Sequence, residues 1–218
     1  MASLFPRWTN SVSKVMAVTT LLVPVVAIGA LWYTARTPFV TNEGIEYDQP
    51  VQFDHRHHNW EQGIDCRYCH TSVEVSATAG IPSTTLCIGC HNQVWNKSPR
   101  LEPVRKAFFE QKPIEWIRVH DVPEFVYFNH SIHVNKGVGC ITCHGRVDQM
   151  PVIHQAMPMT MQWCIACHRT PGPSLRPVEL VTNMTWIPPT GEAGTKLAAD
   201  LIEKYDVKPR SSCTTCHR

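Results

Sequence analysis

The sequence predicts a mainly α-helical and irregular fold, in which one N-terminal transmembrane helix precedes a domain of short helices wrapped around bound cofactors. Three observations predict this class. An uncharged apolar run lies near the N-terminus, the motif Cys-x-x-Cys-His occurs five times, and seventeen prolines and eleven glycines interrupt the chain of 218 residues. No long strand is visible, and short helices are expected near residues 197–205 and in the segments that carry the motifs.

The apolar run VMAVTTLLVPVVAIGALWY covers residues 15–33. It is long enough to cross the hydrocarbon core as a helix. Trp8 and Trp32 fit the interfacial belts at its two ends, and Arg7 and Lys14 favour an N-terminus on the cytoplasmic side. The alternative is a cleaved signal peptide, but the run exceeds the usual apolar core of about 7–15 residues. We therefore expect an uncleaved anchor, with the following domain outside the cytoplasm.

Every cysteine of the chain belongs to a Cys-x-x-Cys-His motif, which is the attachment signature of c-type haem. The two thiols form thioethers with the haem, and the histidine becomes the proximal iron ligand. The thioether residues are Cys66, Cys69, Cys87, Cys90, Cys140, Cys143, Cys164, Cys167, Cys213 and Cys216, and the proximal ligands are His70, His91, His144, His168 and His217. Zinc sites, redox pairs, iron–sulfur ligands or disulfides would not need a histidine directly after each pair. We therefore expect five haem c groups.

The chain contains an internal repeat. FDHRHH at residues 53–58 and FNHSIH at residues 128–133 share the pattern Phe-x-His-x-x-His, and each precedes a haem motif. This predicts an anchor segment (residues 1–36), a linker (37–50) and a pentahaem domain (51–218). The domain divides into a first repeat (51–125), a second repeat (126–200) and a partial third unit (201–218).

Haem must replace most of the usual side-chain core. From Cys66 to His217 there are 152 residues, about thirty per haem, which is too short for an ordinary core around each cofactor. An unliganded chain should therefore fail to fold. The net charge of +2 includes no basic stripe, so we expect no nucleic-acid partner.

The remaining histidines are candidates for the distal iron positions, and their supply exceeds the demand. In each Phe-x-His-x-x-His pattern, two histidines at i and i+3 share one helical face, so each pair should serve two different irons. The predicted distal ligands are His55, His58, His130, His133 and, for the fifth haem, His120. Alternatives for that fifth position are His154, His57 and Met161, and a methionine there would raise the potential of its haem.

Beyond these motifs, the segments WIRVH (116–120), VYFNH (126–130) and MQWCIACHR (161–169) resemble the pentahaem, membrane-anchored cytochrome c subunit of bacterial alternative complex III, a class III-type multihaem cytochrome. The resemblance implies a periplasmic haem domain at the inner membrane. It also implies partners: integral-membrane quinol-oxidising subunits, an iron–sulfur subunit, monohaem cytochrome c subunits and a terminal oxidase. The expected function is electron transfer within this quinol:acceptor oxidoreductase.

Two other functions are consistent with the motifs. One is a membrane-anchored multihaem quinol dehydrogenase that feeds a periplasmic reductase and has its own quinol site. The other is a catalytic multihaem reductase, which needs at least one iron with an open position. The surplus of histidines argues against an open iron, so we expect no catalytic residues in this chain.

Overall fold

The computed structural model describes residues 5–217, and the chain divides into two compact units, residues 1–42 and residues 43–218. The first unit contains α1 (Trp8–Thr34) and the short α2 (Pro38–Thr41). Pro38 at the first turn of α2 and Asn42 in the left-handed region after it mark the ends of this short helix.

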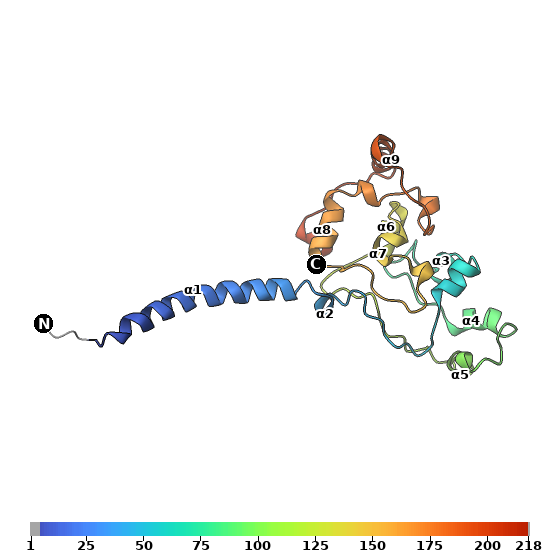
Figure 1. Cartoon of the computed structure of the whole chain (residues 1–218). Helices are drawn as coiled ribbons and strands as arrows, with labels where there is room; N and C mark the ends of the chain where they lie inside the picture. Colours follow the sequence, from blue (N-terminus) through green and yellow to red (C-terminus); the bar gives the residue numbers. More distant parts are fainter. Residues whose placement is uncertain (1–4, 218) are drawn as a thin grey trace. The chain divides into compact units, whose positions relative to one another are not determined.

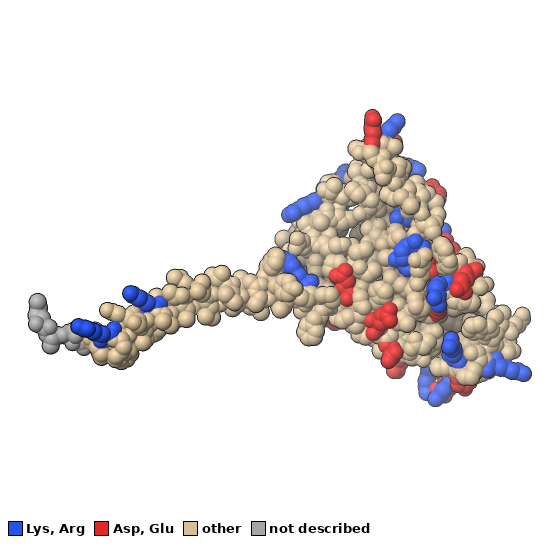
Figure 2. Space-filling model, in the orientation of Figure 1, with Lys and Arg blue, Asp and Glu red and all other residues tan. Residues whose placement is uncertain are grey.

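Helix α1 has 27 residues, so it begins seven residues before the expected span. None of its side chains is buried, and its mean hydropathy of 2.2 makes it long and apolar enough to cross a membrane; a signal sequence meets the same test. Pro24 lies inside the helix without ending it. Figure 2 shows that most of its length carries no lysine, arginine, aspartate or glutamate.

The second unit consists of short helices joined by long irregular segments (Figure 1). Within the part of the chain that the structure describes, isolated bridges occur but no named strand. The helical elements are η1 (Arg56–Glu61), α3 (Cys66–Cys69), α4 (Thr84–His91), η2 (Pro99–Leu101), α5 (Glu102–Phe109), α6 (His130–Asn135), α7 (Cys140–His144), η3 (Val147–Gln149), α8 (Met161–Arg169), η4 (Gly172–Ser174), η5 (Val178–Leu180), α9 (Gly191–Lys204) and α10 (Cys213–Cys216). The expected helical, strand-poor class is confirmed.

The side-chain core of the second unit is thin. Its buried apolar residues are Val51, Val104, Val134, Met150, Leu175, Val181, Met184 and Leu201. A domain of this length normally buries a much larger apolar set. The thin core agrees with the expectation that bound cofactors fill the interior, and it leaves the short helices to position the haem motifs.

Buried polar groups reinforce this core. Asp148, which is 1% exposed, accepts two hydrogen bonds from the guanidinium of Arg146, at 2.8 and 2.7 Å. Buried Arg176 donates to the carbonyl of Asn183 at 2.8 Å and lies over the ring of Trp186. The first pair precedes α8 in the sequence and the second follows it, and each fixes the conformation of a short irregular segment.

Candidate haem-binding sites

Each haem motif forms one turn of helix. The turn places its two cysteines at i and i+3 on one face, with the histidine within the last two helical residues or directly after the helix. All ten cysteines are free thiols. Within residues 5–217, histidine, cysteine, aspartate and glutamate side chains form no group of three that could hold one metal ion. The motifs are thus separate cysteine pairs rather than four-sulfur clusters.

Four of the five proximal histidines share one hydrogen-bonding arrangement. Their Nδ1 atoms lie 2.7 to 3.1 Å from backbone carbonyl oxygens, and a carbonyl can only accept, so Nδ1 carries the proton. The pairs are His70 with Gly80, His91 with Val94, His168 with Arg210, and His217 with Phe125. This tautomer leaves Nε2 free to bind iron, as is usual for metal-ligating histidines.

The histidines of the two repeats follow the same rule. His58 Nδ1 donates to the carbonyl of Asp54 at 2.8 Å, and His133 Nδ1 donates to that of Asn129 at 2.7 Å. Both contacts run from residue i to i−4, so the copies match at the atomic level. His130 Nδ1 donates to the carbonyl of Ala77 at 2.9 Å. These side chains are oriented as metal ligands are, with Nδ1 protonated and Nε2 available for iron.

The phenylalanine of each repeat packs between its two histidines. Phe53 meets His55 edge-on at 4.8 Å between ring centroids and stacks on His58 at 4.3 Å. Phe128 meets the histidines of the second copy in the same way, at 4.7 and 4.6 Å. The phenylalanine therefore fixes both ring orientations, which explains why it recurs with the histidines. The first copy lies on a π-turn, η1, and the second on the α-helix α6.

The structure brings distal candidates opposite proximal histidines. Ring centroids are 6.1 Å apart for His58 and His91. They are 6.3 Å apart for His130 and His144, and 5.9 Å apart for His133 and His168. Since metal–imidazole bonds are about 2 Å long, two imidazoles on opposite sides of one iron have centroids roughly 6 Å apart. The side chains present therefore fit bis-histidine haem.

The protonation states fit as well. Burial, together with the neighbouring His70 and His58, lowers the pKa of His55 to about 4. Burial is also the main cause that lowers the pKa of His144 to about 3 and brings the pKa values of His58 and His133 below the usual range. These imidazoles are neutral at pH 7, which is the form that binds a metal.

The candidates for the fifth distal position have other partners than the proximal histidine of that site, His217. Nε2 of His120 lies 3.2 Å from Nδ1 of His144, so the nitrogen expected on an iron faces a proximal histidine instead. His57 contacts Glu61 at 2.8 Å and stacks on Trp95, and Met161 is exposed. His154 is part-buried, with Nδ1 3.6 Å from a carboxylate oxygen of Glu46. In the described part of the chain, the ring contact of His217 is with Phe125.

Sequence reasoning missed two kinds of residue in these sites. The carbonyl groups of Ala77, Gly80, Val94 and Arg210 orient iron-ligand histidines, but a backbone acceptor leaves no signature in residue identity. The contact of His120 with His144 joins positions 24 residues apart, and no spacing rule predicts it.

Comparison with known proteins agrees with this chemistry. Residues 34–120 match the class III cytochrome c family, and residues 126–218 match cytochrome c7 and related cytochrome c. Over 98 residues the chain is 32% identical to the menaquinone reductase multihaem cytochrome c subunit of Nitratidesulfovibrio vulgaris (strain Hildenborough); the match covers 44% of this chain and 46% of that protein. The first half of the chain is therefore similar to class III cytochromes c and the second half to cytochrome c7, families that bind haem c covalently.

Proposed function

We propose that this chain is the membrane-anchored electron-transfer subunit of a quinol:acceptor oxidoreductase resembling alternative complex III. It carries five haem c groups, one on each Cys-x-x-Cys-His motif. Bound haem c supplies reversible one-electron chemistry. The pentahaem domain lies on the periplasmic side of the bacterial inner membrane, where its partners exchange electrons with it.

The observation that carries this proposal is the opposed pairing of histidine rings at about 6 Å between centroids. Two protein ligands on one iron leave no position for a substrate, so the side chains favour electron transfer over catalysis at the metal. We assign His55 with His70, His58 with His91, His130 with His144, and His133 with His168. The sequence prediction for the fifth distal ligand is His120, whose Nε2 would have to turn away from His144, with His154, His57 and Met161 as alternatives.

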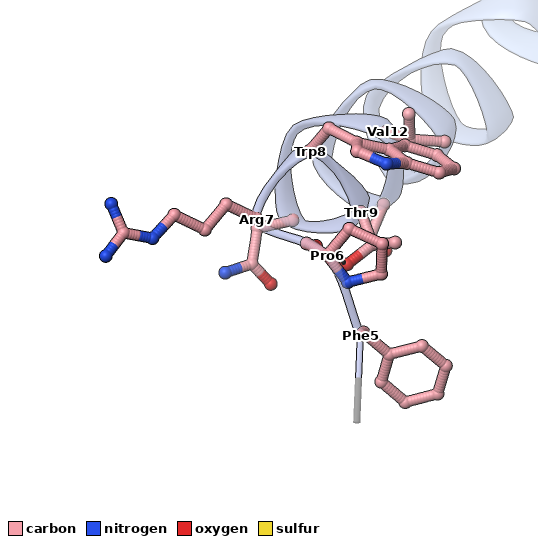
Figure 3. A pocket seen from close by; sticks show the side chains of 8 residues that line it. Phe5, Pro6, Arg7, Trp8, Thr9 and Val12 are labelled. Carbon is pink, nitrogen blue, oxygen red and sulfur yellow. Dashed lines mark hydrogen bonds between the residues drawn. The ribbon is translucent and has the colours of Figure 1, made fainter. Parts of the chain in front are cut away.

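The membrane part of the proposal depends on α1. Figure 3 shows Phe5, Trp8 and Val12 around a hollow at its first turn, with Arg7 extending away from Phe5. At the other end the guanidinium of Arg36 lies 3.9 Å from the centroid of the Trp32 ring and donates to the Trp32 carbonyl at 2.9 Å. An aromatic residue beside a cation at each end is typical of a helix anchored at both membrane interfaces.

The partners follow from the function. One span cannot by itself enclose a quinone, so integral-membrane quinol-oxidising subunits are expected, together with an iron–sulfur subunit, monohaem cytochrome c subunits and a terminal oxidase. The name of the relative from Nitratidesulfovibrio vulgaris supports a quinone-linked complex, although it implies electron flow toward menaquinone in that protein. A chain of six-coordinate haems can carry electrons either toward the quinone or away from it.

Measurements of haem content, carbon monoxide binding and partners on the full-length, haem-loaded chain test this function. Intact mass and a haem assay should give five haems per chain, and the reduced protein should bind no stoichiometric carbon monoxide. Purification in mild detergent should recover integral-membrane partners, and the recovered complex should oxidise quinol. A stoichiometric carbon monoxide complex in intact protein would instead indicate a catalytic reductase.

A second candidate is a multihaem quinol dehydrogenase that works without an integral-membrane partner. The relative from Nitratidesulfovibrio vulgaris favours this candidate, because its name describes a multihaem cytochrome c subunit of a menaquinone reductase. It predicts quinol oxidation by the purified chain alone. Activity that returns only with the membrane partner excludes it.

A further inference from the structure

We infer that the five haems do not follow one another in sequence order but lie in the spatial order 2–1–3–4–5. Sites 1 to 5 are named here for the motifs that begin at Cys66, Cys87, Cys140, Cys164 and Cys213. The inference rests on the proposed occupancy of all five motifs. It makes sites 2 and 5 the ends of the electron path and site 1 an interior position.

Sites 1 and 2 are neighbours because the first Phe-x-His-x-x-His segment provides a histidine to each. His58 on η1 lies opposite His91 of site 2, with 6.1 Å between ring centroids. His55, three residues earlier, is half-buried and has His70 of site 1 as a neighbour, and the backbone N–H of Ile64, two residues before Cys66, donates to the carbonyl of His58 at 3.1 Å.

Sites 3 and 4 are neighbours for the same reason in the second repeat. On α6, His130 lies opposite His144 of site 3 and His133 lies opposite His168 of site 4, at 6.3 and 5.9 Å. Each repeat is thus a two-haem unit held by one short helical turn.

The two repeats join through their first sites. Val181 accepts a hydrogen bond from the backbone N–H of Cys140 at 2.9 Å, while the adjacent Thr182 donates to the carboxylate of Asp65 at 2.8 Å. These two neighbouring residues therefore hold the start of site 3 against the start of site 1. The carbonyl of Ala77, in the loop after site 1, also accepts hydrogen bonds from both the backbone and the ring of His130.

The histidines of sites 1 and 3 come together at this junction. His144 of site 3 is half-buried; its ring lies 6.3 Å from that of His130, and His70 and His55 of site 1 are among its titratable neighbours. Element η1 also packs against η3, which follows site 3 directly. These contacts join site 1 to site 3. Site 2, by contrast, is contacted by His58 of η1, the element that directly precedes site 1.

Site 5 follows site 4. The carbonyl of Arg210, three residues before Cys213, accepts the hydrogen bond from His168 of site 4 at 2.9 Å. The carbonyl of Cys216 accepts one from the backbone of Tyr127, in the segment that leads into α6. Both contacts place site 5 beside the second repeat, and the contact with His168 places it next to site 4.

The consequence is a path with two distinct ends. A partner that exchanges electrons with site 2 and another that exchanges them with site 5 would be connected through sites 1, 3 and 4. Loss of an interior site divides the path, whereas loss of an end site shortens it. Sequence order would instead make site 1 an end, so the two orders differ in what removal of site 1 does.

The experiment uses the full-length chain in its purified complex, with intact mass to count haems. The variant C66A/C69A lacks site 1, and C213A/C216A, which lacks site 5, is its matched control. After rapid mixing with quinol, the control should show all four remaining haems reduced together or, if quinol electrons enter at site 5, none. In the site 1 variant, only the haems connected to the entry point should be reduced within the mixing period. This is one haem if electrons enter at site 2 and three if they enter at site 5.

Rapid reduction of all four haems, or of none, in the site 1 variant would overturn the order. If that variant fails to assemble, an electron cryo-microscopy structure of the unmodified complex decides, because each porphyrin is identified by its cysteine pair. Adjacent pairs 2–1, 1–3, 3–4 and 4–5 support the inference, and adjacency of sites 2 and 3 refutes it while leaving the proposed function intact. Fewer than five haems by mass overturns both.

Discussion

Replacing His130 and His133 separately by methionine tests whether one short helix serves two irons. The ring of His130 lies opposite His144, and that of His133 lies opposite His168. Each substitution should therefore alter one haem only, about one fifth of the low-spin signal, and should raise the potential of that haem because methionine replaces an imidazole. The two altered haems should be different.

The fold should survive either change. Each variant loses one Nδ1 hydrogen bond, to Ala77 or to Asn129, which accounts for about 1 kcal/mol. The N-terminus of α6 keeps its cap, since the Asn129 side chain accepts from the backbone of Ser131 at 2.9 Å. Ile132→Met is the matched control, because Ile132 is 58% exposed on the same helix and ligates nothing in this proposal.

The assay is a redox titration followed by electron paramagnetic resonance, in chains with and without site 3. In the background C140A/C143A, His130→Met should add no further spectral change, while His133→Met should still alter one haem. Perturbation of the same haem by both substitutions, or of none by either, would refute the pairing. A change as large with Ile132→Met would show that the added methionine, and not the lost histidine, is responsible.

Three further predictions concern the stability of the haem-loaded chain, measured by denaturant unfolding. Asp148→Asn should cost about 2 kcal/mol, because the buried partner of Arg146 loses its charge but keeps a hydrogen bond. The control Asp121→Asn removes the charge from an exposed pair with Arg118 and should cost less than about 1 kcal/mol. Equal losses of stability would contradict the role of burial. Gly137→Ala should cost at least about 2 kcal/mol, since Gly137 has φ +82° and a Cβ would lie 2.5 Å from the carbonyl oxygen of Arg176. Gly63→Ala is the control, because Gly63 has φ +68° but open space around it, so that variant measures the backbone strain alone. Equal losses of stability in the two variants would exclude a contribution from the clash with Arg176. Acid should destabilise the protein, because the folded chain holds the imidazoles of His55 and His144 neutral, both as iron ligands and through burial that lowers their pKa values to about 4 and about 3, whereas an unfolded histidine titrates near 6.5. The unfolded state therefore takes up protons first, and stability falls as pH drops below about 6.5. Unchanged unfolding free energy between pH 7 and pH 5 would contradict this.

Local pattern was enough to predict much of the chemistry. The motif spacing indicated haem c and the helical turns that carry it, and the apolar run indicated the helix that the structure extends to Trp8–Thr34. The repeated Phe-x-His-x-x-His placed two histidines on one short helical segment. All of these features depend on residues within a few positions of one another, where geometry follows from spacing.

Which of these groups meet depends on the tertiary structure. His133 faces His168 and His120 faces His144 because of the path of the chain, and several histidines are oriented by carbonyl groups that every residue type provides. Site 1 lies beside site 3 because Val181 and Thr182, far from both in sequence, bond to Cys140 and Asp65. Residue identity and spacing were sufficient to indicate what each site binds, since ligand type is a property of side chains. The order of the sites required the folded chain, since it depends on contacts between distant segments.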